Sequence, residues 1–174
     1  MIDVSVSYNR HKFLGEEFLT WLWFVIEEDA ALLGELEPDG AHLAIGNRIV
    51  LENRHQNTVE SITIKGDDAG LEEGVISLKK GAVVTEMNLS YTSGENQWVF
   101  NLKGESLNFS GLKPPETALI DRKEDIEGAV LEKIYLFDKI IHFIDAVFGQ
   151  FIRLRISNAW QEKVVPRMRA WIAT

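Results

Sequence analysis

The strongest constraint in this sequence is a stretch of about thirty residues, from Asp125 to Ile156, that holds no proline and only two glycines. Its apolar residues recur at steps of three or four, the spacing that places side chains on one face of a helix. They form two adjacent stripes. The first comprises Ile126, Val130, Ile134, Phe137, Ile141, Ile144, Phe148 and Phe151, and the second comprises Leu136, Ile140, Phe143, Val147, Phe151 and Leu154. A helix with so wide an apolar surface must bury two sides at once.

A single small sheet covers only one side of such a helix. The other side needs a further helix or a second copy of the chain. We therefore predict that this helix mediates assembly into a homodimer or a higher oligomer. The residues predicted to form the oligomer interface are Ile134, Phe137, Ile141, Ile144, Phe148 and Phe151.

Most of the remaining chain shows the period-two alternation and the turn residues that are typical of antiparallel strands. Strands are predicted over residues 2–8, 41–45, 48–53, 58–65, 82–92, 97–103 and 106–112. Gly46-Asn47 predicts a two-residue hairpin between two of these strands. Helical spacing predicts shorter helices over residues 14–29 and 69–80. The expected fold is α+β, an antiparallel sheet of about six strands with helices packed on one face.

Pro114-Pro115 ends the sheet, because proline cannot donate to the strand ladder. We predict an α+β sheet domain over residues 1–113 and a helical region over 114–174, packed together as one compact unit. The helical region holds the long helix, residues 122–156, and a short helix, residues 159–172, which Pro166 should kink or divide. Asp121 and Glu124 fit a capping box at the start of the long helix.

No catalytic, metal or cofactor site is predicted from the residue types and their spacing. Cysteine is absent, which excludes disulfides, thiolate zinc sites and thiol nucleophiles. The four histidines show no metal-ligand spacing, and His142 is expected to lie on a polar strip of the long helix beside acids. Three acidic pairs lie near predicted helix starts: Glu16-Glu17, Asp67-Asp68 and Glu124-Asp125. Negative charges at these positions interact favourably with the helix macrodipole. Because helix capping explains these acids, a metal-dependent nuclease that would use them as metal ligands is the weakest alternative function.

The net charge of −9 is unevenly distributed. Residues 153–174 hold five basic residues and one acid, a balance of +4 that leaves −13 on the other 152 residues. Such polarity can orient a nucleic-acid contact, or it can dock a basic tail on an acidic partner subunit. The tryptophans beside these charges have helical spacing, so we expect burial rather than base stacking.

No basic-then-apolar leader opens the sequence. The apolar stretch at residues 18–26 is far shorter than the ~20 residues of a membrane span. We expect a cytoplasmic protein with no membrane partner, located in the nucleoid if it binds DNA.

Several segments resemble the RdgC-like, recombination-associated family, in particular its short bacterial members. The residues that carry the resemblance are Phe13–Phe24, Lys80–Leu89, Trp98–Phe100, Gly111–Lys113 and Glu124–Ile126. They are sheet and core residues, and none belongs to a catalytic motif.

The resemblance covers roughly residues 13 to 152 and corresponds to the C-terminal half of full-length members. It implies a non-catalytic protein that binds DNA without sequence preference, restrains recombination and works as a closed dimer. That is our leading expectation, with a protein-interaction module that has lost DNA contact as the alternative. The predicted DNA-binding residues are the basic residues with the fewest acidic neighbours in the sequence: Lys79, Lys80, Arg153, Arg155, Lys163, Arg167 and Arg169.

Overall fold

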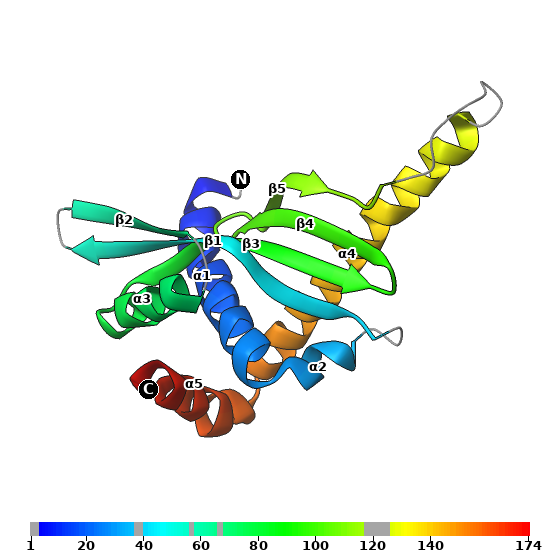
Figure 1. The fold of residues 1–174 in the computed structure, drawn as a ribbon. Helices are drawn as coiled ribbons and strands as arrows, with labels where there is room; N and C mark the ends of the chain where they lie inside the picture. Colours follow the sequence, from blue (N-terminus) through cyan, green and yellow to red (C-terminus); the bar gives the residue numbers. More distant parts are fainter. Residues whose placement is uncertain (1–3, 37–39, 56–57, 66–67, 117–125) are drawn as a thin grey trace.

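Five antiparallel strands form one sheet in the order β2-β1-β3-β4-β5 (Figure 1). Their bounds are His42–His55 for β1, Thr58–Lys65 for β2, Val83–Ser93 for β3, Asn96–Lys103 for β4 and Asn108–Lys113 for β5. The computed structural model describes residues 4–36, 40–55, 58–65, 68–116 and 126–174. The expected α+β class with one antiparallel sheet is confirmed.

Helices cover one face of the sheet, and α1 and α4 run behind it in the view of Figure 1. Their bounds are Val4–Glu28 for α1, Ala30–Gly34 for α2, Asp68–Lys79 for α3, Ile126–Arg155 for α4, Trp160–Val164 for the π-helical turn η2 and Val165–Ala173 for α5. None of the helices in the described ranges is long and apolar enough to cross a membrane.

The core lies between the sheet and the helices. Strand β4 turns Trp98, Phe100 and Leu102 inward, and all three side chains are fully buried. The Trp98 indole Nε1–H also donates to the Leu136 carbonyl oxygen over 2.8 Å, which holds α4 to the sheet. On the opposite face, the Asn88 amide donates to Asn101 Oδ1 over 2.8 Å. Buried residues from both sides of the proline pair form one hydrophobic cluster.

The predicted hairpin at Gly46-Asn47 is wrong, because β1 continues through it as a single strand. Ile45 pairs with Leu89 and Ile49 pairs with Met87, so three residues of β1 lie opposite the single residue Asn88 of β3, and the dipeptide is part of a bulge. The Asn47 N–H donates to Asn88 Oδ1 over 3.2 Å. A Cβ atom at Gly46 would lie 1.9 Å from the same oxygen. The glycine therefore permits a close cross-strand contact and makes no turn.

The predicted first strand is also wrong where the structure describes it. Residues 4–8 belong to α1, and residues 1–3 lie outside the described ranges. No proline or glycine occurs before Gly15, so the helix extends through this segment without a second nucleation step. Strand β5 begins at Asn108 because a turn occupies residues 104–107, with Leu107 at φ 52°.

The C-terminal segment changes from the π-helical turn η2 to α5 at Val165, and Pro166 is the second residue of α5. Val164 and Val165 both have helical backbone angles, so the helix is not broken at this junction, and the kink at Pro166 stays a prediction. The predicted capping residues Asp121 and Glu124 lie outside the described residues.

Candidate functional site

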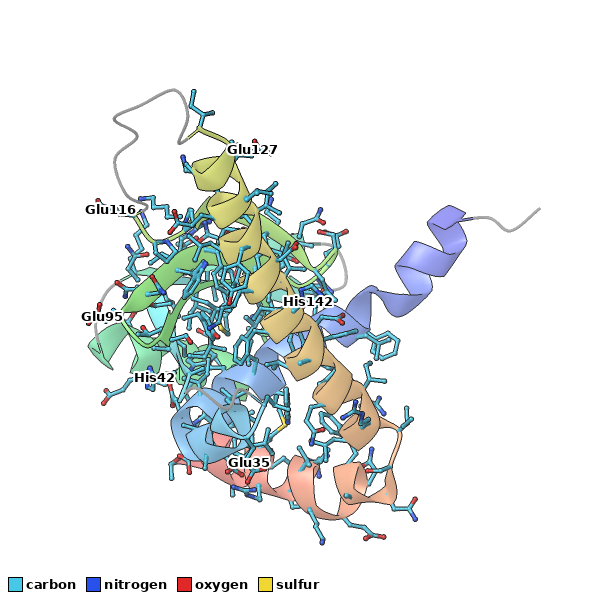
Figure 2. All side chains as sticks on the ribbon, turned by 90° about the vertical axis from the view of Figure 1, so that its right-hand side faces the viewer. Glu35, His42, Glu95, Glu116, Glu127 and His142 are labelled. Carbon is cyan, nitrogen blue, oxygen red and sulfur yellow. The ribbon has the colours of Figure 1, made fainter. Side chains whose placement is uncertain are left out.

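Helix α4 buries some of its apolar side chains and leaves others exposed. The buried side chains are Leu136, Ile140, Phe143, Ile144, Val147 and Phe151. Along the N-terminal half of the helix, large apolar side chains are between 46% and 64% exposed. These residues, called here the α4 apolar stripe, are Ile126, Val130, Leu131, Ile134, Tyr135 and Ile141. In Figure 2, Glu127 and His142 mark the two ends of this stretch, and in Figure 1 its first turns extend past the sheet.

The residues predicted for the oligomer interface divide between these two environments. Ile134 and Ile141 are exposed, and Phe137 is half-buried. The other three pack inside the chain's own core: Ile144 and Phe151 are buried, and the ring centroid of Phe148 lies 5.1 Å from that of Phe18 in an edge contact. Assembly through α4 stays a prediction, centred on the N-terminal half of the helix.

Sequence reasoning missed Leu131 and Tyr135, the two most exposed members of the stripe. They are four residues apart, so they are neighbours on the helix surface. This spacing of four residues could have identified them as an exposed apolar pair. Neither residue belongs to the two apolar stripes that the sequence pattern predicts for this helix.

Two predicted DNA-binding arginines hold carboxylates of the same chain. Arg155 Nε donates to Glu17 Oε2 over 2.6 Å, and its guanidinium lies 5.4 Å from the centroid of the Trp160 ring. Arg167 Nη1 donates to Asp29 Oδ2 over 3.0 Å. Both arginines tie the C-terminal region to α1 or the residue that follows it, which reduces their availability to phosphate.

The remaining predicted cations lie on the surface. The Lys79 ammonium donates to the Ala173 carbonyl oxygen over 3.1 Å. The other four are exposed, and within the described residues no ion pair is formed by Lys80, Arg153, Lys163 or Arg169.

The tryptophans near these cations are buried, as expected. Trp160 is 5% exposed and Trp171 is 7% exposed. The Glu27 carboxylate accepts the indole N–H groups of Trp23, over 2.5 Å, and of Trp171, over 3.2 Å. Glu27 therefore joins α1 to α5 through Trp171, and Trp160 packs against Phe151 of α4. Neither Trp160 nor Trp171 presents an open face to a nucleic-acid base.

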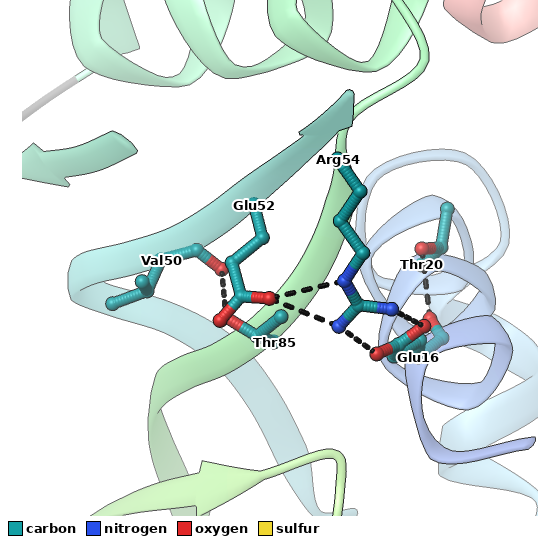
Figure 3. Close-up of polar contacts among 6 residues, drawn as sticks. All are labelled: Glu16, Thr20, Val50, Glu52, Arg54 and Thr85. Atoms are coloured by element: carbon teal, nitrogen blue, oxygen red, sulfur yellow. Dashed lines mark hydrogen bonds and ion pairs between the residues drawn. The ribbon is translucent and has the colours of Figure 1, made fainter. Parts of the chain in front are cut away.

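An ion pair between a buried carboxylate and an exposed arginine joins α1 to β1 (Figure 3). Glu16 is 7% exposed, and both of its carboxylate oxygens accept from the Arg54 guanidinium. Glu52 accepts from Arg54 Nε over 3.2 Å and from Nη2 over 2.9 Å. The hydrogen bond to Glu16, followed by the contact with Glu52, raises the pKa of Arg54 above its ordinary value.

The expectation that Glu16-Glu17 marks a helix start is therefore wrong. Both residues lie in the interior of α1, which begins at Val4, and they bind Arg54 and Arg155. The predicted pairs at 67–68 and 124–125 fall largely outside the described residues, although Asp68 does begin α3.

Among the described residues, no three histidine, aspartate or glutamate side chains are grouped so that they could hold a metal ion. On the predicted polar strip, His142 Nδ1 lies 2.8 Å from the Asp138 backbone oxygen. Comparison of the chain with protein-family models, curated proteins and solved structures finds no match in any of the three. The function is therefore proposed from the chain's own geometry.

Proposed function

We propose that the chain works without catalysis, as a protein-interaction module that associates with a second copy along the α4 apolar stripe. The observation that carries this proposal is a run of six large apolar side chains, 46% to 64% exposed, on a helix whose other face is already buried. Monomeric proteins rarely leave large apolar patches in water. Burial of such a patch stabilises an assembly by about 25 cal/mol for each Å² removed from water.

A second copy suits this surface because a two-fold interface brings the same patch from each protomer together. The charged residues of the same stretch are nearly balanced in sign: Glu127, Glu132, Lys133, Asp138 and Lys139. Their formal charges sum to −1, so the net repulsion between two copies of this stretch is small.

Ile134→Asp is expected to convert the dimer to a folded monomer. Ile134 is 52% exposed within the chain, so the new carboxylate leaves the protomer core intact. In the dimer it would be buried without a partner, which should raise the dissociation constant about 100-fold or more. Sedimentation velocity at micromolar concentration measures the assembly, and circular dichroism checks the fold.

The matched control is Ile76→Asp, because Ile76 on α3 is 48% exposed and lies outside the α4 apolar stripe. This variant should remain dimeric. A native chain that sediments as a monodisperse monomer at micromolar concentration contradicts the proposal, as does dissociation of both variants to the same extent.

Sequence-independent DNA binding of the RdgC-like type is the second candidate function. It is favoured by the four exposed cations that form no ion pair with described residues: Lys80, Arg153, Lys163 and Arg169. Accessible cations of this kind release counterions from phosphate and bind without reading bases.

If DNA binds, replacing Lys163 and Arg169 together with alanine should lower the affinity equally for unrelated sequences. The slope of log affinity against log salt should flatten by roughly 1.8, since each phosphate contact contributes about 0.9. Arg167→Ala is the control, and it should change the slope less because Asp29 already holds this guanidinium. Fluorescence anisotropy at several salt concentrations measures both effects.

Absence of binding to single- and double-stranded DNA at about 50 mM salt, a condition that favours phosphate contacts, would reject this candidate. The same samples test the nuclease alternative, which requires cleavage of the DNA when magnesium is added.

A further inference from the structure

A cleft of about 550 Å³ lies between α1, α3, β3, η2 and α5. This volume is within the range of small-ligand pockets, which is about 300 to 1,000 Å³. Most of its wall is apolar, with contributions from Leu78, Val83, Trp160, Val165, Met168 and Ile172. The cleft is separate from the α4 apolar stripe, so the inference below does not depend on the proposed function.

The polar groups that line the cleft are mostly satisfied within the chain. The Glu16 carboxylate binds Arg54, and the Glu17 carboxylate binds Arg155. Their negative charges are therefore neutralised by neighbouring guanidinium groups. A ligand in the cleft meets apolar walls more often than unpaired polar atoms.

Arg169 also lines the cleft. It lies on α5, is exposed, and forms no ion pair within the part of the chain that the structure describes. Met168 beside it and Val165 and Ile172 on the same helix contribute apolar wall. The cleft thus combines an apolar interior with one cation that has no carboxylate of its own.

We propose that this cleft binds an amphipathic anion, an unbranched alkyl carboxylate, with the alkyl chain against the apolar wall and the carboxylate on Arg169. A guanidinium presents two parallel N–H donors that match the two oxygens of a carboxylate. The alkyl chain supplies affinity in proportion to the apolar area removed from water. The two parts of the ligand therefore correspond to the two parts of the cleft.

Calorimetric titration of the full chain with octanoate, decanoate and dodecanoate, each below its micellar concentration, tests the proposal. Affinity should rise about fourfold for each added methylene while the chain still finds apolar wall. Decanol, which has the same chain and no charge, should bind at least about tenfold more weakly than decanoate, because charge-assisted hydrogen bonds to Arg169 are lost.

Arg169→Ala should weaken decanoate about tenfold and leave decanol unchanged, and Arg169→Lys should recover part of the loss. Arg153→Ala is the matched control, since Arg153 is exposed but does not line the cleft, and it should leave decanoate affinity unchanged. Met168→Trp, which fills the cleft, should abolish binding of both ligands while circular dichroism shows an unaltered fold.

Three results would overturn the proposal. They are no saturable binding of decanoate up to millimolar concentration, equal affinity for decanoate and decanol, and equal loss of decanoate affinity in Arg153→Ala and Arg169→Ala. Binding that depends on chain length, on the carboxylate and on Arg169 together supports it.

Discussion

Replacing Gly15 with alanine should destabilise the fold by about 3 kcal/mol, because the added methyl group has no space. Gly15 lies where α1 crosses the turn between β4 and β5, and a Cβ atom there would lie 1.7 Å from the Gly104 carbonyl oxygen. That turn cannot withdraw freely, since the Gly104 N–H donates to the Thr85 carbonyl oxygen over 2.9 Å. Alanine gains about 1 kcal/mol of helix propensity over glycine, which is too little to offset the overlap.

Equilibrium urea unfolding followed by circular dichroism measures this change, and Gly149→Ala is its matched control. Gly149 also lies inside a long helix, but a Cβ atom there would meet nothing within 4 Å. That variant should be about 0.5 to 1 kcal/mol more stable than the native chain. If both substitutions stabilise the protein equally, the close approach at Gly15 is wrong.

Arg54→Met should lower the free energy of unfolding by roughly 3 kcal/mol. Glu16, which is 7% exposed in the native chain, would then lose both hydrogen bonds from its guanidinium partner. Because the fold raises the pKa of Arg54, the stability that this group contributes is complete at neutral pH. It is lost only as the pH rises through that raised pKa, in strongly alkaline solution.

Two further variants separate the Glu16–Arg54 pair from an ordinary surface pair. Arg54→Met combined with Glu16→Met should recover most of the lost stability, because no charge is then left buried without a partner. Arg167→Met breaks the ion pair with Asp29, in which the arginine side chain is 56% exposed, and should cost less than about 1 kcal/mol. Equal losses for Arg54→Met and Arg167→Met in thermal unfolding would contradict the assignment of Glu16 as a buried charge.

The local sequence pattern predicted the structure correctly where the residues of one strand or helix determine it. The alternation of Trp98, Phe100 and Leu102 predicts a half-buried strand, and β4 has that orientation. Here the neighbouring elements bury the same face of the strand that the side-chain period marks as apolar.

The local sequence pattern gave a wrong prediction where contacts with a distant segment of the chain determine the structure. The dipeptide Gly46-Asn47 alone predicts a turn. In the structure the Asn88 side chain accepts a hydrogen bond from the Asn47 backbone, and β1 continues through the dipeptide as a single strand. Glu16 likewise reads as a solvated acid, and only the fold brings Arg54 to it from 38 residues away. Long-range contacts of this kind leave no periodic signal in the sequence.

By itself, the sequence determined that the long helix has two apolar sides, because helical geometry places its leucine, isoleucine, valine and phenylalanine residues around most of the circumference. Only the tertiary structure decided which of these side chains the protomer buries. The sheet and α1 reach the helix from about Leu136 onward and cover Ile140, Phe143 and Val147. The turns before Leu136 pass beyond the sheet, so Val130 and Ile134 stay in water within the single chain. Ile141 lies within the covered part but points away from the sheet, and it is also exposed. The physical reason is reach and side: a small sheet buries only the length and the face of a long helix that lie against it.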